Sequence, residues 1–261
     1  MPQAPVHMVM PPEWQLALTI AFGIFAAASY AYGLVLASRS RNAFPLLVIV
    51  GGTVAVLLEA PIDILGLCYW PEQGQWTAYE AFGRRIPWIT VGAYTTFYGG
   101  VVLYTLRQFE QGLEARRLWK WFSIWMIFEW TWEPVPIYFG VWNYYGAQPF
   151  RVLDFPLWWP PVNTVGAYTA AYLLHRVRPH LKGFSMLLAV PLVASGDAMG
   201  NAAVAWPLWV TMNSNLGYVA TVPAGILTLI LCAAAIFAIT RSVGTKKAVP
   251  HAGVRPVLKP T

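Results

Sequence analysis

Long apolar runs separated by short polar loops dominate the chain. The runs lie over about 14–37, 44–67, 86–106, 117–139, 156–175, 183–206 and 217–240. As a helix, a run of about 20 apolar residues is long enough to cross the hydrocarbon core of a bilayer. The pattern therefore predicts an all-α membrane protein, a bundle of about seven transmembrane helices.

The composition supports a protein that lies mostly within a membrane. Of the 261 residues, 57% are hydrophobic and only 11% are charged, whereas an average soluble domain is about 25% charged. We expect a single transmembrane domain over 1–241 in a multi-pass protein of the cell (cytoplasmic) membrane. The proline-containing, basic stretch 242–261 is predicted to be a disordered cytoplasmic tail.

The positions of the basic residues predict the orientation. Fourteen Lys and Arg residues fall in the tail and in the loops after spans one, three and five, and three lie on the opposite side. Basic residues concentrate in cytoplasmic loops, so the N-terminus is predicted outside and the C-terminus in the cytoplasm. These bases do not gather on one amphipathic face, which argues against a nucleic-acid partner. The oligomeric state stays open.

Pairs of polar side chains four residues apart recur in three of the predicted spans. On a helix this spacing places both members on one face. The pairs are Glu59 and Asp63, Glu129 and Glu133, and Asp197 and Asn201.

All three pairs lie in the outer halves of their spans in the predicted orientation, and Asn163 begins span five at a similar depth. A charged side chain at the bilayer centre costs about 2.5–3.5 kcal/mol on insertion scales, so these groups should face the bundle interior. We expect a shared functional cavity. The alternative is that they only join helices by hydrogen bonds.

An internal repeat accompanies the acidic pairs. The sequence Thr-Val-Gly-Ala-Tyr-Thr occurs at 90–95 and again at 164–169, and the two Glu-led pairs are offset by a similar length of 70 residues. Spans two and three therefore resemble spans four and five as parallel two-helix repeats, and spans six and seven suggest a weaker third copy.

Aromatic residues flank the acids. A belt of Trp and Tyr at the membrane interface accounts for most of them. A sharper hypothesis is that a few bind the substrate and stabilise a cationic intermediate through their π-faces. The predicted substrate-binding residues are Trp130, Trp132, Asn163, Asn201, Trp158 and Tyr145. Asp154, which precedes Phe155-Pro156, is predicted to cap the start of span five.

The histidines argue against several kinds of metal site. His7, His175, His180 and His251 lie in tails or at cytoplasmic ends, away from the acids. A haem or a carboxylate–histidine iron centre is therefore not expected, and we predict neither a cofactor nor a bound metal.

Two stretches carry a resemblance to a known family. They are Leu58-Glu59-Ala60-Pro61-Ile62-Asp63-Ile64-Leu65-Gly66 with Tyr69-Trp70-Pro71, and Tyr144-Tyr145-Gly146-Ala147-Gln148-Pro149-Phe150 with Phe155-Pro156-Leu157-Trp158-Trp159. These resemble the AveC-type spirocyclase family of actinobacterial membrane proteins over roughly 44–206. The resemblance implies spiroketal formation and dehydration of a polyketide. A looser similarity is to small fungal membrane terpene cyclases.

The first functional hypothesis is a cofactor-independent cyclase or dehydratase acting on a lipophilic polyketide or isoprenoid. Glu129 and Glu133 are the preferred acid–base pair, because two neighbouring carboxylates in an apolar site cannot easily both ionise. Glu59 and Asp63 would orient groups or relay protons, and Asp197 would hold the substrate. The alternative is a carrier or proton-coupled transporter of small lipophilic molecules, and a third hypothesis is a structural membrane subunit.

Overall fold

The computed structural model describes residues 2–214 and 216–243, which are mostly helical. The helical elements are α1 (Pro12–Ser40), α2 (Phe44–Ala55), η1 (Val56–Leu58), α3 (Glu59–Gly66), α4 (Trp88–Tyr94), η2 (Thr95–Val101), α5 (Val102–Glu110), α6 (Ala115–Trp132), α7 (Pro134–Tyr138), α8 (Trp159–Val177), η3 (Arg178–His180), η4 (Gly183–Leu188), α9 (Ala189–Met212) and α10 (Tyr218–Val243). The predicted tail begins at Ser242, within α10; its part from 244 onward lies outside the described residues.

Four helical segments of the described chain are long and apolar enough to cross a membrane. They are Pro12–Ser40, Phe44–Gly66, Gly183–Met212 and Tyr218–Val243. The prediction of a helical membrane protein is confirmed at this level. Helices also occupy 88–110, 115–132 and 159–177, where further spans were predicted.

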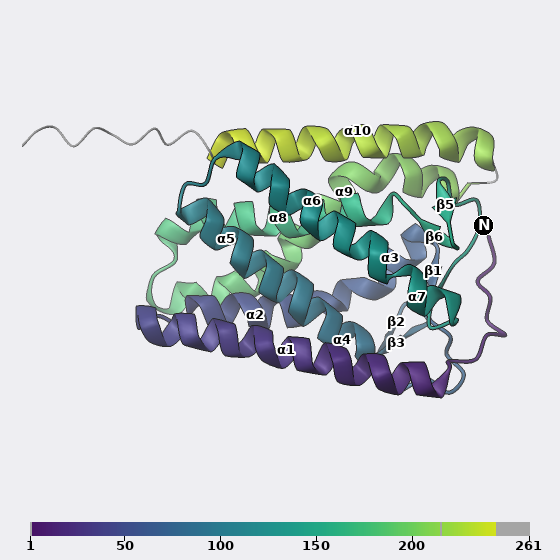
Figure 1. Cartoon of the computed structure of the whole chain (residues 1–261), viewed down its shortest axis with the longest axis horizontal. Coiled ribbons are helices and arrows are strands. Elements are labelled where there is room, and N and C mark those ends of the chain that lie inside the picture. The colour runs from purple at the N-terminus through teal and green to yellow at the C-terminus, as the bar shows by residue number, and fades with distance from the viewer. Residues whose placement is uncertain (1, 215, 244–261) are drawn as a thin grey trace, which may run out of the picture.

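Helix α8 lies at the centre of the molecule. Its Val162, Ala167 and Leu174 side chains are fully buried, and most other residues of this helix are buried too. It packs mainly on α9, where a β-carbon at Gly200 would come within 2.7 Å of the Gly166 Cα atom. The two backbones touch only because neither residue has a side chain. In contrast, α1 and α10 form opposite edges of the bundle (Figure 1).

Three helical rods of the described chain are interrupted, two of them close to one end of the bundle and the third near its middle. The turn η1 separates α2 from α3, just before Pro61, and the carbonyl oxygen of Val56 accepts a hydrogen bond of 2.5 Å from the Tyr79 hydroxyl. The π-helical turn η2 separates α4 from α5, and Glu133 joins α6 to α7 at Pro134. Proline removes a helical hydrogen bond, and π-turns are frequent at functional sites.

Short strands, which the sequence analysis did not predict, gather at this end, hereafter the strand end (Figure 1). Three antiparallel pairs form. They join β1 (Cys68–Tyr69) with β4 (Asn143–Tyr144), β2 (Thr77–Ala81) with β3 (Arg84–Pro87), and β5 (Arg151–Val152) with β6 (Phe155–Pro156).

The β5–β6 hairpin corrects one prediction. Helix α8 begins at Trp159, and Asp154 does not cap it. Asp154 instead lies in the two-residue turn with Leu153, with φ angles of 62° and 49°. Positive φ at both residues is typical of the tight hairpin turn that matches the strand twist. The Asp154 carboxylate also pairs with Arg151 at 3.1 Å.

The N-terminal segment covers the strand end. The backbone nitrogen of Met10 donates to the Gln73 carbonyl at 2.8 Å, and Gln15 hydrogen bonds with Gly74 and Trp76. The trace of this segment runs across that end of the bundle in Figure 1. These contacts tie the start of the chain over the ends of the interrupted helices.

Candidate active site

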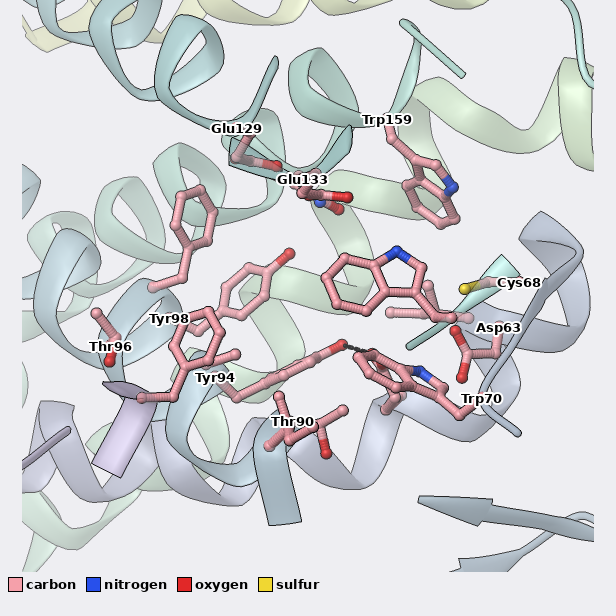
Figure 2. Close-up of a pocket in the computed structure, with 18 of the residues that line it drawn as sticks. Asp63, Cys68, Trp70, Thr90, Tyr94, Thr96, Tyr98, Glu129, Glu133 and Trp159 are labelled. Atoms are coloured by element: carbon pink, nitrogen blue, oxygen red, sulfur yellow. Dashed lines mark hydrogen bonds between the residues drawn. The ribbon is translucent and has the colours of Figure 1, made fainter. Parts of the chain in front are cut away.

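A cavity of about 160 Å³ lies among the interrupted helices, at the strand end. Its lining comes from α1, α3, α4, η2, α6, α8 and the segments around β1 and β4. Four carboxyl side chains reach it: Glu59, Asp63, Glu129 and Glu133. Figure 2 shows Glu129 of α6 and Glu133, which follows α6, on one side and Asp63 with Tyr94 and Trp70 on the other. The structure thus brings the two predicted acidic pairs together.

Glu59 is held by two aromatic donors. The Trp70 indole nitrogen donates to its Oε1 atom at 3.0 Å, and the Tyr94 hydroxyl donates to its Oε2 atom at 2.8 Å. Asp63 lies one turn further along α3 and is 4% exposed. Both oxygens of Glu59 are therefore occupied, which suits an orienting role better than proton donation.

Glu129 keeps one oxygen unpaired. Its Oε2 atom accepts a hydrogen bond of 2.9 Å from the Asn163 amide nitrogen. Its Oε1 atom is buried and has no hydrogen-bond partner. Glu133 accepts only a long hydrogen bond, 3.4 Å, from the Tyr144 hydroxyl. An unpaired buried oxygen costs stability, so Glu129 is the carboxyl group best placed to meet a ligand.

The β1–β4 pair connects the two acidic pairs. Cys68 follows the α3 acids and pairs with Tyr144, which follows the α6 acids. At the end of α3, a β-carbon on Gly66 would come within 2.3 Å of the Trp159 ring. The absence of a side chain at Gly66 lets Trp159 of α8 close this side of the cavity.

Two polar groups of this sheet are neutral donors. Desolvation by burial raises the pKa of the Cys68 thiol, and the neighbouring Asp63 carboxylate reinforces the shift. Burial also raises the pKa of the Tyr144 hydroxyl, with Glu133 acting in the same direction. Each therefore keeps its proton at neutral pH, and Cys68 is not a thiolate nucleophile.

The predicted substrate-binding residues divide into two groups. Trp132 and Asn163 line the cavity, whereas Trp130, Trp158, Tyr145 and Asn201 do not. Successive residues of a helix point about 100° apart, so the face that carries Glu129 and Glu133 turns Trp130 away.

Each residue outside the cavity has another partner. The Trp130 indole donates to the Leu157 carbonyl at 2.9 Å. Trp158 is fully buried and donates to the Gln148 side-chain oxygen at 3.1 Å. The Tyr145 hydroxyl accepts a hydrogen bond of 2.9 Å from Arg84. These contacts hold the three side chains outside the carboxyl-lined cavity, and substrate binding by them stays a prediction.

Asp197 and Asn201 lie behind the cavity wall. Both are fully buried, and the Asn201 amide donates to the Asp197 Oδ1 atom at 2.7 Å. They pack against Gly166 of α8 and next to Tyr98, which lines the cavity. Tyr98 thus stands between the cavity and Asp197, which does not line the cavity, and the expectation that Asp197 holds the substrate stays a prediction.

Several lining residues were missed by the sequence analysis. Tyr94, Tyr98, Trp70 and Tyr144 all belong to the cavity wall. Tyr94 lies inside the repeated Thr-Val-Gly-Ala-Tyr-Thr sequence, so the repeat was the signal that could have identified it. For Tyr98, the π-turn that places it is not visible as a sequence pattern.

Comparisons with known proteins add no identification. No protein-family model, no curated protein and no solved structure matches the chain. Within residues 2–214 and 216–243, no group of three or more His, Cys, Asp or Glu residues is placed to hold a metal ion. The absence of a cofactor and the resemblance to spirocyclases both stay predictions.

Proposed function

We propose that the protein is a membrane-embedded, cofactor-independent cyclase and dehydratase that acts on a lipophilic keto-alcohol of polyketide or isoprenoid type. The observation that carries this proposal is the meeting of two carboxyl pairs in one small cavity, with the Glu129 Oε1 atom unpaired. General acid–base catalysis needs a neutral acid and a carboxylate close to the same substrate atoms. The resemblance to the AveC-type spirocyclase family points to the same reaction.

The proposed reaction joins a ketone and two hydroxyl groups with loss of water. One hydroxyl oxygen attacks the carbonyl carbon to give a hemiketal, and its proton passes to a carboxylate of the cavity. Protonated Glu129 then gives its proton to the hemiketal hydroxyl, which leaves as water. The second hydroxyl attacks the resulting oxocarbenium carbon and gives its proton to Glu129. The hemiketal hydroxyl forms before water leaves, when the first carboxyl group returns its proton to the carbonyl-derived oxygen, so both carboxyl groups end in their starting states.

The surrounding side chains would support this charge movement. Trp132 lies in the cavity wall, where its π-face would stabilise the oxocarbenium cation. Asn163 would hold Glu129 in position through its hydrogen bond. Tyr94 and Trp70 would fix Glu59 as an orienting group. The small apolar cavity limits competing water.

The test is a direct product assay. The protein is purified, reconstituted in lipid nanodiscs, and incubated with a long-chain ketone that carries a hydroxyl group on each side of its carbonyl. Mass spectrometry should show product lighter by one water, formed by wild type and by Asp154→Asn but not by Glu129→Gln. Bound but unchanged ketone in the wild-type sample would refute the enzyme proposal.

A carrier of small lipophilic molecules is the alternative function. One observation favours it: the acids stand at interruptions of α2–α3 and α6–α7, and broken helices are typical of transporter binding sites. A carrier would move the unchanged ketone between vesicle populations, and this transfer would depend on the protein. The product assay and the transfer assay therefore separate the two functions.

We further propose that all seven predicted spans cross the membrane, with the strand end outside. The loops that hold most Lys and Arg lie between helix ends opposite the strand end (Figure 1). The parallel repeats rest on the repeated sequence at 90–95 and 164–169. In each copy the first threonine hydroxyl donates to a carbonyl of the preceding turn, Thr90 to Pro87 three residues back at 2.7 Å and Thr164 to Pro160 four residues back at 2.8 Å, so these contacts are similar but not equivalent. A shared ancestry of spans two and three with spans four and five would explain the repeated sequence.

A further inference from the structure

The cavity wall is aromatic and partly exposed on one side. Phe128 of α6 is 52% exposed, and Phe22, Phe97 and Trp132 are half-buried. Phe22 and Trp132 meet edge to face, with their ring centres 5.2 Å apart. We call these four residues the aromatic window. They come from α1, η2 and α6, so the window lies on the flank of the helical bundle.

The helices beside the window are held apart by side chains. Helix α6 packs mainly on α8 and α10, whereas α4 and η2 pack mainly on α1 and α2. Contacts across the gap include Tyr104 of α5 with Trp121 and Trp125 of α6, at ring-centre distances of 5.0 and 6.1 Å. These contacts lie toward the end opposite the strands, which leaves aromatic side chains as the barrier near the acids.

In contrast to the aromatic window, the cavity is closed at the strand end. Trp70, Trp142, Tyr144 and Cys68 form that side of the cavity, and each is at most 9% exposed. The N-terminal segment lies over the same end, as described above. A route through this end would require several hydrogen-bonded segments to move, whereas the window requires only aromatic side chains to rotate.

The window opens at a depth where lipid is expected. Phe22 is ten residues into α1, about 15 Å from its start, and no charged residue lies between Glu13 and Arg39 of that helix. The outward surface of α6 next to Phe128 is also apolar, with Ile127 50% exposed. A molecule leaving the cavity through the window would therefore pass into hydrocarbon.

The cavity volume limits what it can enclose. At about 160 Å³ it is close to the engineered cavity of about 150 Å³ that holds a benzene molecule. A polyketide or isoprenoid chain is several times larger than benzene. Only the reacting end of such a molecule fits beside the four carboxyl groups, and the remainder needs a path out.

We propose that the ligand reaches the acids sideways from the bilayer, through the aromatic window, and leaves its apolar tail in the lipid while its oxygen-bearing end occupies the cavity. The ligand class is a membrane-partitioned chain with oxygen groups at one end. The identity of the reacting end rests on the proposed function. The route does not rest on it, because a ligand that binds in the cavity needs a way in whether or not it reacts.

The test measures labelling, not turnover. A long-chain ketone with a photoreactive diazirine beside its carbonyl is dissolved in the lipid of nanodiscs that hold the full chain. After illumination, labelled peptides are identified by mass spectrometry. We expect labels on the peptides that contain Tyr94 and Glu129. Phe128→Trp, which fills the window, should lower this labelling by about tenfold, equivalent to about 1.4 kcal/mol.

Two variants provide controls for Phe128→Trp. Ile127→Trp introduces the same side chain at the neighbouring lipid-facing position of α6 and should label as wild type does. Phe128→Ala opens the window and should label at least as well as wild type. If Phe128→Trp is poorly folded, the second measurement decides: a ketone with a sulfonated tail, added from water, should not label the cavity of wild type.

The outcomes separate the route from the chemistry. Equal labelling of wild type and Phe128→Trp, or strong labelling by the sulfonated ketone, would overturn lateral access. The labelling measurement needs no turnover, so it is also made with the Glu129→Gln variant. A labelled cavity without any loss of water in wild type would refute the enzyme proposal and leave the lateral route standing.

Discussion

Replacement of Glu129 by glutamine tests the central claim about the cavity. The substitution keeps the size of the side chain and its hydrogen bond to Asn163, since the glutamine oxygen can accept the 2.9 Å bond from the Asn163 amide. The glutamine NH₂ group would then take the place of the buried, unpaired Oε1 atom. Only the exchangeable proton is removed from the site.

The expected effect on stability is small. A hydrogen bond to a charged group is worth about 1.5–3 kcal/mol, and one between neutral groups about 0.5–1.5 kcal/mol. For a charged Glu129 the difference sets an upper limit of about 2.5 kcal/mol on the loss; for the protonated Glu129 of the proposed mechanism, both groups are neutral and the loss is smaller. The variant should therefore insert in the membrane and be purified in normal yield.

The expected effect on catalysis is large. Loss of general acid–base assistance typically lowers the rate by about 10²- to 10⁴-fold, which corresponds to about 2.7–5.4 kcal/mol of transition-state stabilisation. Glu133→Gln should show a loss in the same range, because Glu133 lies one turn away on the same cavity wall.

The assay compares product formation at matched protein concentrations in nanodiscs. Asp154→Asn is the matched control, because it also changes a carboxylate to an amide but lies in an exposed hairpin turn. Its rate should stay close to that of wild type. Wild-type turnover by both glutamine variants would exclude the α6 pair from the mechanism and redirect attention to Glu59.

Three further predictions follow from other contacts. Gly66→Ala should lower the melting temperature and the rate, because its β-carbon would lie 2.3 Å from the Trp159 ring and overpacking typically costs about 1–3 kcal/mol; an unchanged melting temperature would contradict this packing. Tyr94→Phe removes one of two donors to Glu59 and should reduce turnover less than Glu129→Gln does; a larger loss would assign Tyr94 a direct chemical role. A reporter fused after Thr261 should read cytoplasmic, and an external signal would reverse the proposed orientation.

The sequence by itself determined the class of protein and the unusual acidic pairs within its apolar runs. Apolar runs of membrane-spanning length require backbone groups to be paired within each segment, so they dictate helices. The four-residue spacing of Glu59 with Asp63 and of Glu129 with Glu133 depends only on local helix geometry. The cost of burying acids in lipid then implied that these pairs face inward, and the structure places both pairs in one cavity.

Only the tertiary structure decided which neighbours complete the site. Trp130 and Trp132 are two residues apart, yet Trp132 lines the cavity and Trp130 packs elsewhere, because helix rotation and the position of α8 assign their faces. Tyr98 reaches the cavity through a π-turn. Cys68 pairs with Tyr144 in a two-stranded sheet whose strands are 76 residues apart in the sequence. Such contacts depend on how separate elements pack, and local sequence patterns carry no information about that packing.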